Sequence, residues 1–170
     1  MPTFTLSVAA LLLTVSLGAA QAGGGAAPVT PANAQVQAAT PTAVAAALRE
    51  AGYAVTVNPV DTDEDPSLSV KAGNYELDVW FSGCRGTSCD RVTASTSWDY
   101  EDDAGSLDTD LANEWNSNYF TQAYVYEGSY YLDSTLTLRG GYTKAALGAW
   151  MEDYLGDVED FEAELPGGEE

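Results

Sequence analysis

The stretch Tyr119–Leu138, YFTQAYVYEGSYYLDSTLTL, decides the fold of this chain. Two runs rich in aromatic and β-branched residues meet at Gly128-Ser129, a pattern typical of a β-hairpin. Along the second run, apolar and polar side chains alternate: Leu132, Leu136 and Leu138 on one side, Asp133, Thr135 and Thr137 on the other. The period of two predicts a strand with one face toward a core.

After the hairpin, Gly140-Gly141 interrupts the strand pattern and Thr143 is the expected first residue of a long helix. Apolar residues recur there at helical spacing, at Leu147, Met151, Tyr154, Val158, Phe161 and Leu165. From Glu152 onward the chain carries acidic residues and no basic one. Because negative charge at a helix C-terminus opposes the macrodipole, we expect the last turn to fray.

On the other side of the hairpin, Leu107, Leu111 and Trp115 recur every four residues and predict a helix ending in the polar residues 116–118. Further upstream, the alternation predicts four strands, at residues 53–57, 67–71, 75–81 and 91–98. The last of these is rich in Thr and Ser, as solvated strands often are. A first helix is expected after Thr40, an N-cap followed by Pro41.

This order of elements, α-β-β-β-β-α-β-β-α, predicts an α+β domain over residues 40–165, an antiparallel sheet with helices on one face. Residues 1–22 resemble a secretory signal, with cleavage predicted after Ala22, and an uncleaved N-terminal anchor is the alternative. Residues 23–39 are expected to be a flexible Ala/Gly/Pro linker, and residues 166–170 an acidic disordered tail. The predicted localisation is secreted or periplasmic.

The composition excludes several classes of partner and chemistry. Twenty-six acidic residues against six basic ones give a net charge of −20, which repels nucleic acid and anionic membrane surfaces. The chain has no histidine, so imidazole-dependent triads and the commonest metal ligand are absent. We therefore predict no nucleic-acid partner, no anionic membrane partner, no metal and no cofactor.

The two cysteines, Cys84 and Cys89, are separated by four residues. Their spacing differs from the redox Cys-x-x-Cys motif, and a zinc site would need two further His or Cys ligands that the chain lacks. Secretion would place them in an oxidising compartment, which favours a disulfide closing the loop between two strands. A redox role stays as the alternative, because Arg85 and Arg91 lower a thiol pKa in such surroundings.

Two acidic segments are candidate sites. The turn at residues 61–65 places carboxylates at alternate positions as calcium loops do, although Pro66 and Ala72 stand where an EF-hand has Gly and Glu. It is either a weak calcium contact or a solvated turn. The carboxylates of residues 99–103 could serve as a glycosidase-like acid and base, but crowded loop carboxylates are usually a solubilising surface. We predict no enzyme.

Aromatic residues offer the remaining candidates. Trp115 and Asn116 at a helix end form either a ligand-facing patch or a structural pair. In the structural interpretation, which is favoured, Trp115 is buried and the amide of Asn116 or Asn118 caps the helix. Four tyrosines on or next to the hairpin form the candidate partner surface: Tyr119, Tyr126, Tyr130 and Tyr131. Such a surface would contact a protein, or the rings would only stabilise the hairpin through cross-strand pairs.

The segments LANEWNSNYFTQAYVYEGSYYLDSTLTLRGGYT and LGAWMEDYLGDVEDFEAEL resemble the YbjN domain family of bacterial proteins. The resemblance rests on Asn113, Trp115, Asn116, Phe120, Tyr124, Gly140, Gly141 and Phe161, with LREAGYAV and the paired cysteines resembling secreted members. It covers residues 41–165 and implies a fold similar to type III secretion chaperones. It implies no catalytic residue, because the family has no established chemistry.

Three functions follow from these observations. A secreted binding, assembly or regulatory module, either dimeric or bound to a polypeptide partner, is favoured by the resemblance. A small carboxylate-dependent hydrolase would need two acidic residues converging in a cleft. A purely structural acidic extracellular protein would need neither a cleft nor a partner.

Overall fold

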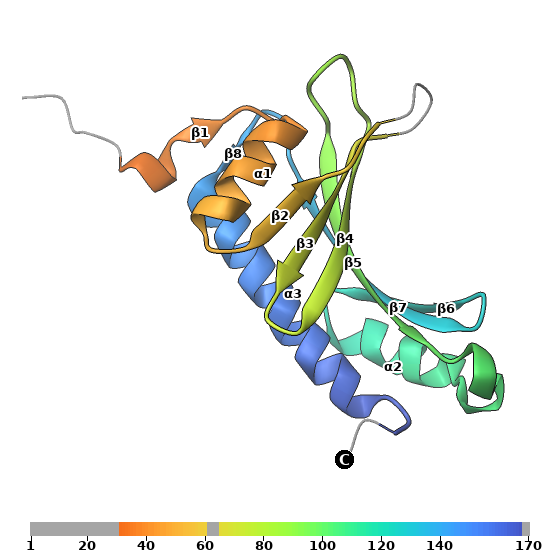
Figure 1. Cartoon of the computed structure of the whole chain (residues 1–170). Helices are drawn as coiled ribbons and strands as arrows, with labels where there is room; N and C mark the ends of the chain where they lie inside the picture. The colour runs from red at the N-terminus through yellow and green to blue at the C-terminus, as the bar shows by residue number, and fades with distance from the viewer. Residues whose placement is uncertain (1–30, 61–64, 168–170) are drawn as a thin grey trace, which may run out of the picture.

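The computed structural model describes residues 31–60 and 65–167. At its centre is a six-stranded antiparallel sheet of strand order β2-β3-β4-β5-β7-β6 (Figure 1). Its strands are β2 (Ala54–Val57), β3 (Ser67–Ala72), β4 (Tyr75–Ser82), β5 (Arg91–Asp99), β6 (Gln122–Tyr126) and β7 (Ser129–Thr137). The predicted α+β class and element order are confirmed.

The helices are α1 (Pro41–Glu50), α2 (Thr109–Asn118) and α3 (Lys144–Glu164), with short 3-10 turns η1 (Ala32–Ala34) and η2 (Glu101–Ser106). Thr40 and Thr143 are the N-caps of α1 and α3, and each hydroxyl accepts a hydrogen bond from the backbone three residues on. Asp108 caps α2, so Leu107 lies just before this helix instead of inside it.

One face of the sheet forms the core together with the helices. Alternate strand residues are buried on this face, among them Leu68, Val70, Leu77, Val79, Phe81, Val92, Ala94, Ala123, Tyr130 and Leu132. The predicted seam of α3 is buried against them throughout. On the opposite face of the sheet, the side chains of Lys71, Glu76 and Asp78 are exposed, so this part of that face is open to solvent.

Strand β5 differs from the solvated strand predicted for residues 91–98. It lies in the middle of the sheet, between β4 and β7, and its residues 92–96 are all buried. Their hydroxyls are satisfied inside the protein, because Thr93 hydrogen-bonds Thr135 and Thr96 hydrogen-bonds Tyr154, both at 2.8 Å. The position of a strand in the sheet, which its composition does not encode, decides its burial.

The hairpin turn is formed by Glu127 and Gly128, one residue earlier than predicted. Both have positive φ, 44° and 84°, as a two-residue type I′ turn requires. Strand β6 covers β7 only over residues 129–133, whereas β7 continues to Thr137 against β5. The second half of β7 is therefore an edge of the sheet.

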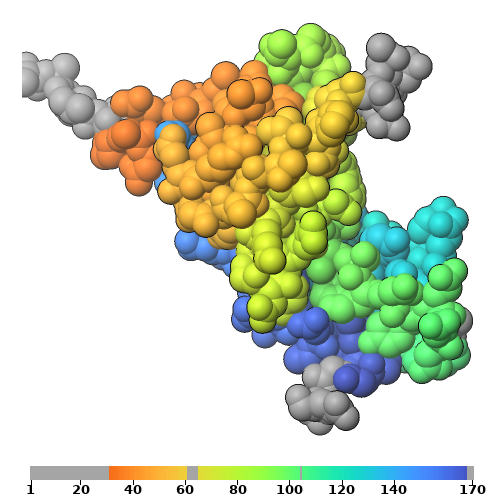
Figure 2. Space-filling view, viewed as in Figure 1, coloured from red at the N-terminus to blue at the C-terminus, as the bar shows by residue number. Residues whose placement is uncertain are grey.

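The flexible linker predicted for residues 23–39 differs from the structure in its described part. Strand β1 (Val36–Gln37) pairs antiparallel with β8 (Tyr142–Thr143), so the folded domain begins before residue 40. Gly141 permits this contact: its φ is +96°, and a Cβ there would lie 2.8 Å from the backbone oxygen of Gln37 and also against Val36. In Figure 2 the orange residues of η1, β1 and α1 lie over the upper blue end of α3.

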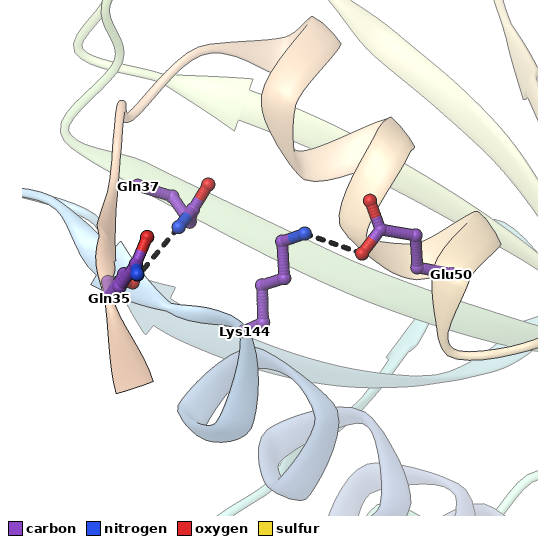
Figure 3. A network of polar contacts seen from close by, with 4 residues as sticks. All are labelled: Gln35, Gln37, Glu50 and Lys144. Atoms are coloured by element: carbon purple, nitrogen blue, oxygen red, sulfur yellow. Dashed lines mark hydrogen bonds and ion pairs between the residues drawn. The ribbon is translucent and has the colours of Figure 1, made fainter. Parts of the chain in front are cut away.

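Two polar contacts lie near this end of the domain, one within the N-terminal segment and one between α1 and α3 (Figure 3). The side chain of Gln37 donates to the backbone oxygen of Gln35, while Lys144 at the start of α3 pairs with Glu50 at the end of α1. The Glu50 side chain is 61% exposed, so this ion pair contributes little free energy. It joins the ends of two helices that also pack through their apolar sides.

The C-terminal end of α3 is held by three hydrogen bonds, which argue against the expected fraying. Glu162 accepts from the Tyr75 hydroxyl at 2.6 Å and from the Trp98 indole at 3.0 Å. The Tyr100 hydroxyl donates to the backbone oxygen of Pro166 at 2.7 Å. These contacts oppose the fraying that the macrodipole term favours in the last turn.

Four predicted segments lie wholly or partly outside the described residues: the signal at 1–22, linker residues 23–30, the acidic turn at 61–64 and the tail at 168–170. Among the residues that the structure does describe, no helix is long and apolar enough to cross a membrane.

Candidate functional site

The four tyrosines predicted as a partner surface do not lie together. Tyr130 is fully buried, because its ring points to the core face of β7, and it cannot contact a partner. Tyr119 is 39% exposed and stacks on Trp115, with ring centroids 3.7 Å apart. Tyr126, 57% exposed, and the half-buried Tyr131 lie on the open face of the hairpin. Only these two form part of one exposed surface.

Next to them, Tyr124 stacks on Tyr131 with ring centroids 5.1 Å apart and donates a hydrogen bond to Asp133 at 3.2 Å. Burial and the neighbouring Asp133 carboxylate raise the pKa of Tyr124 to about 12. Burial also raises the pKa of Asp133. These rings are joined in a cross-strand pair, which is the stabilising alternative.

The predicted disulfide between Cys84 and Cys89 is present, in the loop joining β4 and β5. Arg85 and Ser88 exchange backbone hydrogen bonds inside it, and the backbone N–H of Cys89 donates to Ala39 at 2.8 Å. The bridge therefore closes a tight turn, and the backbone of Cys89 in that turn holds the segment that precedes α1.

Of the two acidic segments, the structure describes the second in full and the first only at Asp65. Residues 61–64 of the candidate calcium turn lie outside the described residues. In the second segment, Asp99 accepts from the backbone N–H of Glu101 at 2.8 Å and Asp103 pairs with the Ser106 hydroxyl. These carboxylates cap their own turn. In the described part of the chain, no group of three or more His, Cys, Asp or Glu side chains is placed to hold a metal ion.

The structure agrees with the favoured structural interpretation of Trp115 and Asn116, and of the two candidate caps it is Asn118 that bonds the helix end. Trp115 is 1% exposed. The Asn116 side chain forms two hydrogen bonds with the backbone of Ala123 in β6, at 2.7 and 2.9 Å, instead of capping the helix. Asn118 takes the capping role, since its amide donates to the backbone oxygen of Glu114. Asn116 thus ties α2 to the edge strand.

A groove of about 630 Å³ lies between α3, the second half of β7 and the segment that joins α2 to β6. Its aromatic lining includes Tyr119, Trp150 and Phe120, whose relative exposure of 109% means that its ring packs on nothing. Trp150 is half-buried and donates to the Ser134 hydroxyl at 2.9 Å. A wholly exposed phenylalanine beside a groove is a common feature of contact surfaces.

The α3 side of the groove is acidic. Asp153, Asp157 and Asp160 line it, and their spacing places them along one side of the helix. Asp157 accepts from Thr121 at 2.9 Å, and Thr121 accepts from the Trp115 indole at 2.9 Å. Burial, together with the charges of Asp160 and Asp153, raises the pKa of the Asp157 carboxyl. The groove therefore favours a cationic group over an anionic one.

Comparisons with known proteins identify the family. Residues 40–166 match the family YbjN, described as "Putative bacterial sensory transduction regulator". The chain belongs to the YbjN family. Among curated proteins none matches it. Among solved structures, this YbjN domain is similar to an uncharacterized protein from Methanothermobacter thermautotrophicus, at 14% identity and a TM-score of 0.45, over 68% of this chain and 89% of that one.

The groove of this YbjN domain was not found from the sequence. Phe120 reads as one more aromatic residue of a strand, and only the structure shows that β6 begins two residues after it. Gly156 lies within α3, where a glycine is unfavourable by about 1 kcal/mol relative to alanine. That glycine lines the groove, and a Cβ there would meet nothing within 4 Å, so packing does not require it. A glycine inside a helix, without a packing reason, is the one feature of the sequence that points to this groove.

Proposed function

We propose that this YbjN-family protein is a secreted or periplasmic, non-enzymatic module that binds a polypeptide partner, in an assembly or regulatory role. The observation that carries the proposal is Phe120, whose relative exposure is 109% beside a groove of about 630 Å³. When a partner covers an exposed ring, the complex is stabilised by roughly 25 cal/mol per Å² of apolar surface removed from water. The family description, a regulator, agrees with a binding role.

The non-enzymatic part rests on the absence of histidine from the sequence and on the acidic loop of residues 99–103, where Asp99 and Asp103 bond groups of their own turn. A net charge of −20 opposes close association of two copies, so a different polypeptide is favoured over a homodimer. Solution mass at physiological salt tests this choice, with a monomer as the expected result.

Affinity capture from envelope extract tests binding. The native chain is the bait, the Phe120→Asp variant is the matched control, and an unrelated protein of similar net charge removes nonspecific capture. We expect a polypeptide retained by the native chain alone. Equal retention by all three baits, or none by the native chain, would refute the proposal and favour a purely structural acidic protein.

Secretion has its own test. The signal at residues 1–22 predicts that the N-terminus of the exported protein is Gly23. N-terminal sequencing of protein recovered from the envelope or the medium measures it. An intact Met1 would contradict cleavage and favour the uncleaved anchor.

A further inference from the structure

The groove is bordered by an unpaired strand edge. Leu138 donates its backbone N–H to Asp90, on the β5 side of the sheet. Backbone N–H and C=O groups alternate in direction along a strand, so those of Thr135 and Thr137 point away from β5. On that side the pairing with β6 stops at the pair Gln122–Asp133. No described strand pairs with them there. We call Thr135 and Thr137 the β7 edge; both side chains are exposed.

An exposed strand edge is a template for an added strand, since its N–H and C=O groups have fixed direction and spacing. Natural proteins block such edges with charged side chains, proline or covering elements. Here Asn116 blocks β6 by binding Ala123. The β7 edge itself carries two threonines, which favour strands and leave the approach open.

The remaining boundaries of the groove specify the chemistry of an added strand. Asp153, Asp157 and Asp160 form the acidic boundary on α3, and Gly156 between them leaves room for a side chain. Trp150, one turn earlier on α3, and Phe120, in the segment before β6, supply apolar contact. An extended segment in this space meets carboxylates from α3, aromatic rings beside them and backbone hydrogen-bonding groups at the β7 edge.

From this geometry we infer that the groove binds an extended, basic segment of a partner polypeptide, which adds as a strand to the β7 edge and directs Lys or Arg side chains to Asp153, Asp157 and Asp160. The inference rests on the proposed function and specifies its partner. The chain itself does not supply such a segment, because its six basic residues are dispersed and the first is Arg49. A second copy would bring a net charge of −20 to an acidic groove.

The charge requirement is tested by titrating the full-length protein with short synthetic peptides. Trp fluorescence or calorimetry measures the binding. We expect a peptide of alternating Lys and Val to bind and a matched Glu and Val peptide not to bind. The double variant Asp153→Asn/Asp157→Asn should weaken binding about tenfold, as expected for two partly exposed ion pairs. The control Glu159→Gln/Glu164→Gln removes the same charge from α3 outside the groove and should leave binding unchanged.

Strand addition has separate tests. N-methylation of alternate peptide residues should abolish binding, and Thr135→Pro should do the same, since it removes an N–H that faces away from β5. The N-methylated peptide leaves the protein unchanged, so loss of its binding cannot come from unfolding of a variant. Equal binding of the methylated peptide, or competition by spermidine at equal affinity, would overturn the inference.

The outcomes also separate this inference from the proposed function. If the native chain captures an envelope polypeptide and the Asp153→Asn/Asp157→Asn variant captures it equally, the basic-segment inference fails and the binding function stands. If the native chain captures none, the proposed function fails first.

Discussion

Truncation of Phe161 to alanine tests the packing on which this account of the fold depends. Phe161 is fully buried near the end of α3. Its ring lies 5.0 Å from Trp115, 5.4 Å from Trp98 and 6.0 Å from Tyr130, measured between ring centroids. One side chain therefore joins the long helix to α2, β5 and β7, and these contacts come from residues far apart in the sequence.

The magnitude follows from burial and ring contacts. Buried phenylalanines replaced by alanine cost about 3–5 kcal/mol, through lost transfer free energy and the cavity that remains. Aromatic pairs add roughly 0.5–1.5 kcal/mol each, so Phe161→Ala belongs at the upper end of that range. For a domain of this size the midpoint of thermal unfolding should fall by about 12–20 °C.

The chain supplies a matched control for this measurement. Phe120→Ala removes the same atoms from a ring that is wholly exposed, and should change the free energy of unfolding by less than about 0.5 kcal/mol. Urea or thermal unfolding of both variants, followed by circular dichroism, gives the comparison. A loss below about 1 kcal/mol for Phe161→Ala, or equal losses for the two, would refute the packing.

Three further predictions use pairs of residues or a change of pH. Gly140→Ala and Gly141→Ala both strain a backbone of positive φ, but only the Gly141 variant brings a Cβ against β1. Gly141→Ala should therefore lose more stability in thermal unfolding and expose β1 to protease, whereas equal losses would mean that β1 does not pack there. Burial raises the pKa of Asp133 above its unfolded value, so the contribution of this carboxyl to stability is present at low pH and is lost as the pH rises through the folded pKa. Asp133→Asn should therefore raise the midpoint of unfolding at neutral pH and flatten the pH dependence of that midpoint, and an unchanged pH profile would contradict this. Gly156→Ala and Gly148→Ala meet no atom within 4 Å and should each stabilise α3 by up to about 1 kcal/mol, measured by urea unfolding, whereas destabilisation by either would show that the helix needs its glycine.

Local patterns were sufficient for most of the fold. The Thr40 and Thr143 caps, the alternation along β4 and the seam of α3 are each encoded within a short window of sequence, and each is found in the structure. The disulfide was predictable for the same reason, because both cysteines lie in one loop. Periodicity and capping report how a segment packs without reference to its neighbours.

The differences arise where a distant segment decides the outcome. The burial of β5 depends on its place between β4 and β7, and the pairing of β1 depends on Gly141, more than a hundred residues further on. The Tyr130 ring is buried because α3 and η2 cover its side of the hairpin, which its neighbours in sequence do not reveal. Propensity is a weak guide wherever tertiary contacts override it.

The groove shows how a structural motif produces a candidate binding surface. Continuation of β6 toward residue 120 would cover β7 further, but Trp115 holds Thr121 through its indole, and Asn116 holds Ala123. The chain leaves α2 and enters the sheet only at Gln122, so the β7 edge stays open beyond that point. Thr121 also donates to Asp157, which connects the end of β6 to the acidic side of α3. The Trp115-Asn116 pair, for which the sequence favours a structural role, therefore fixes where β6 begins and so leaves the β7 edge without a neighbouring strand of the described chain.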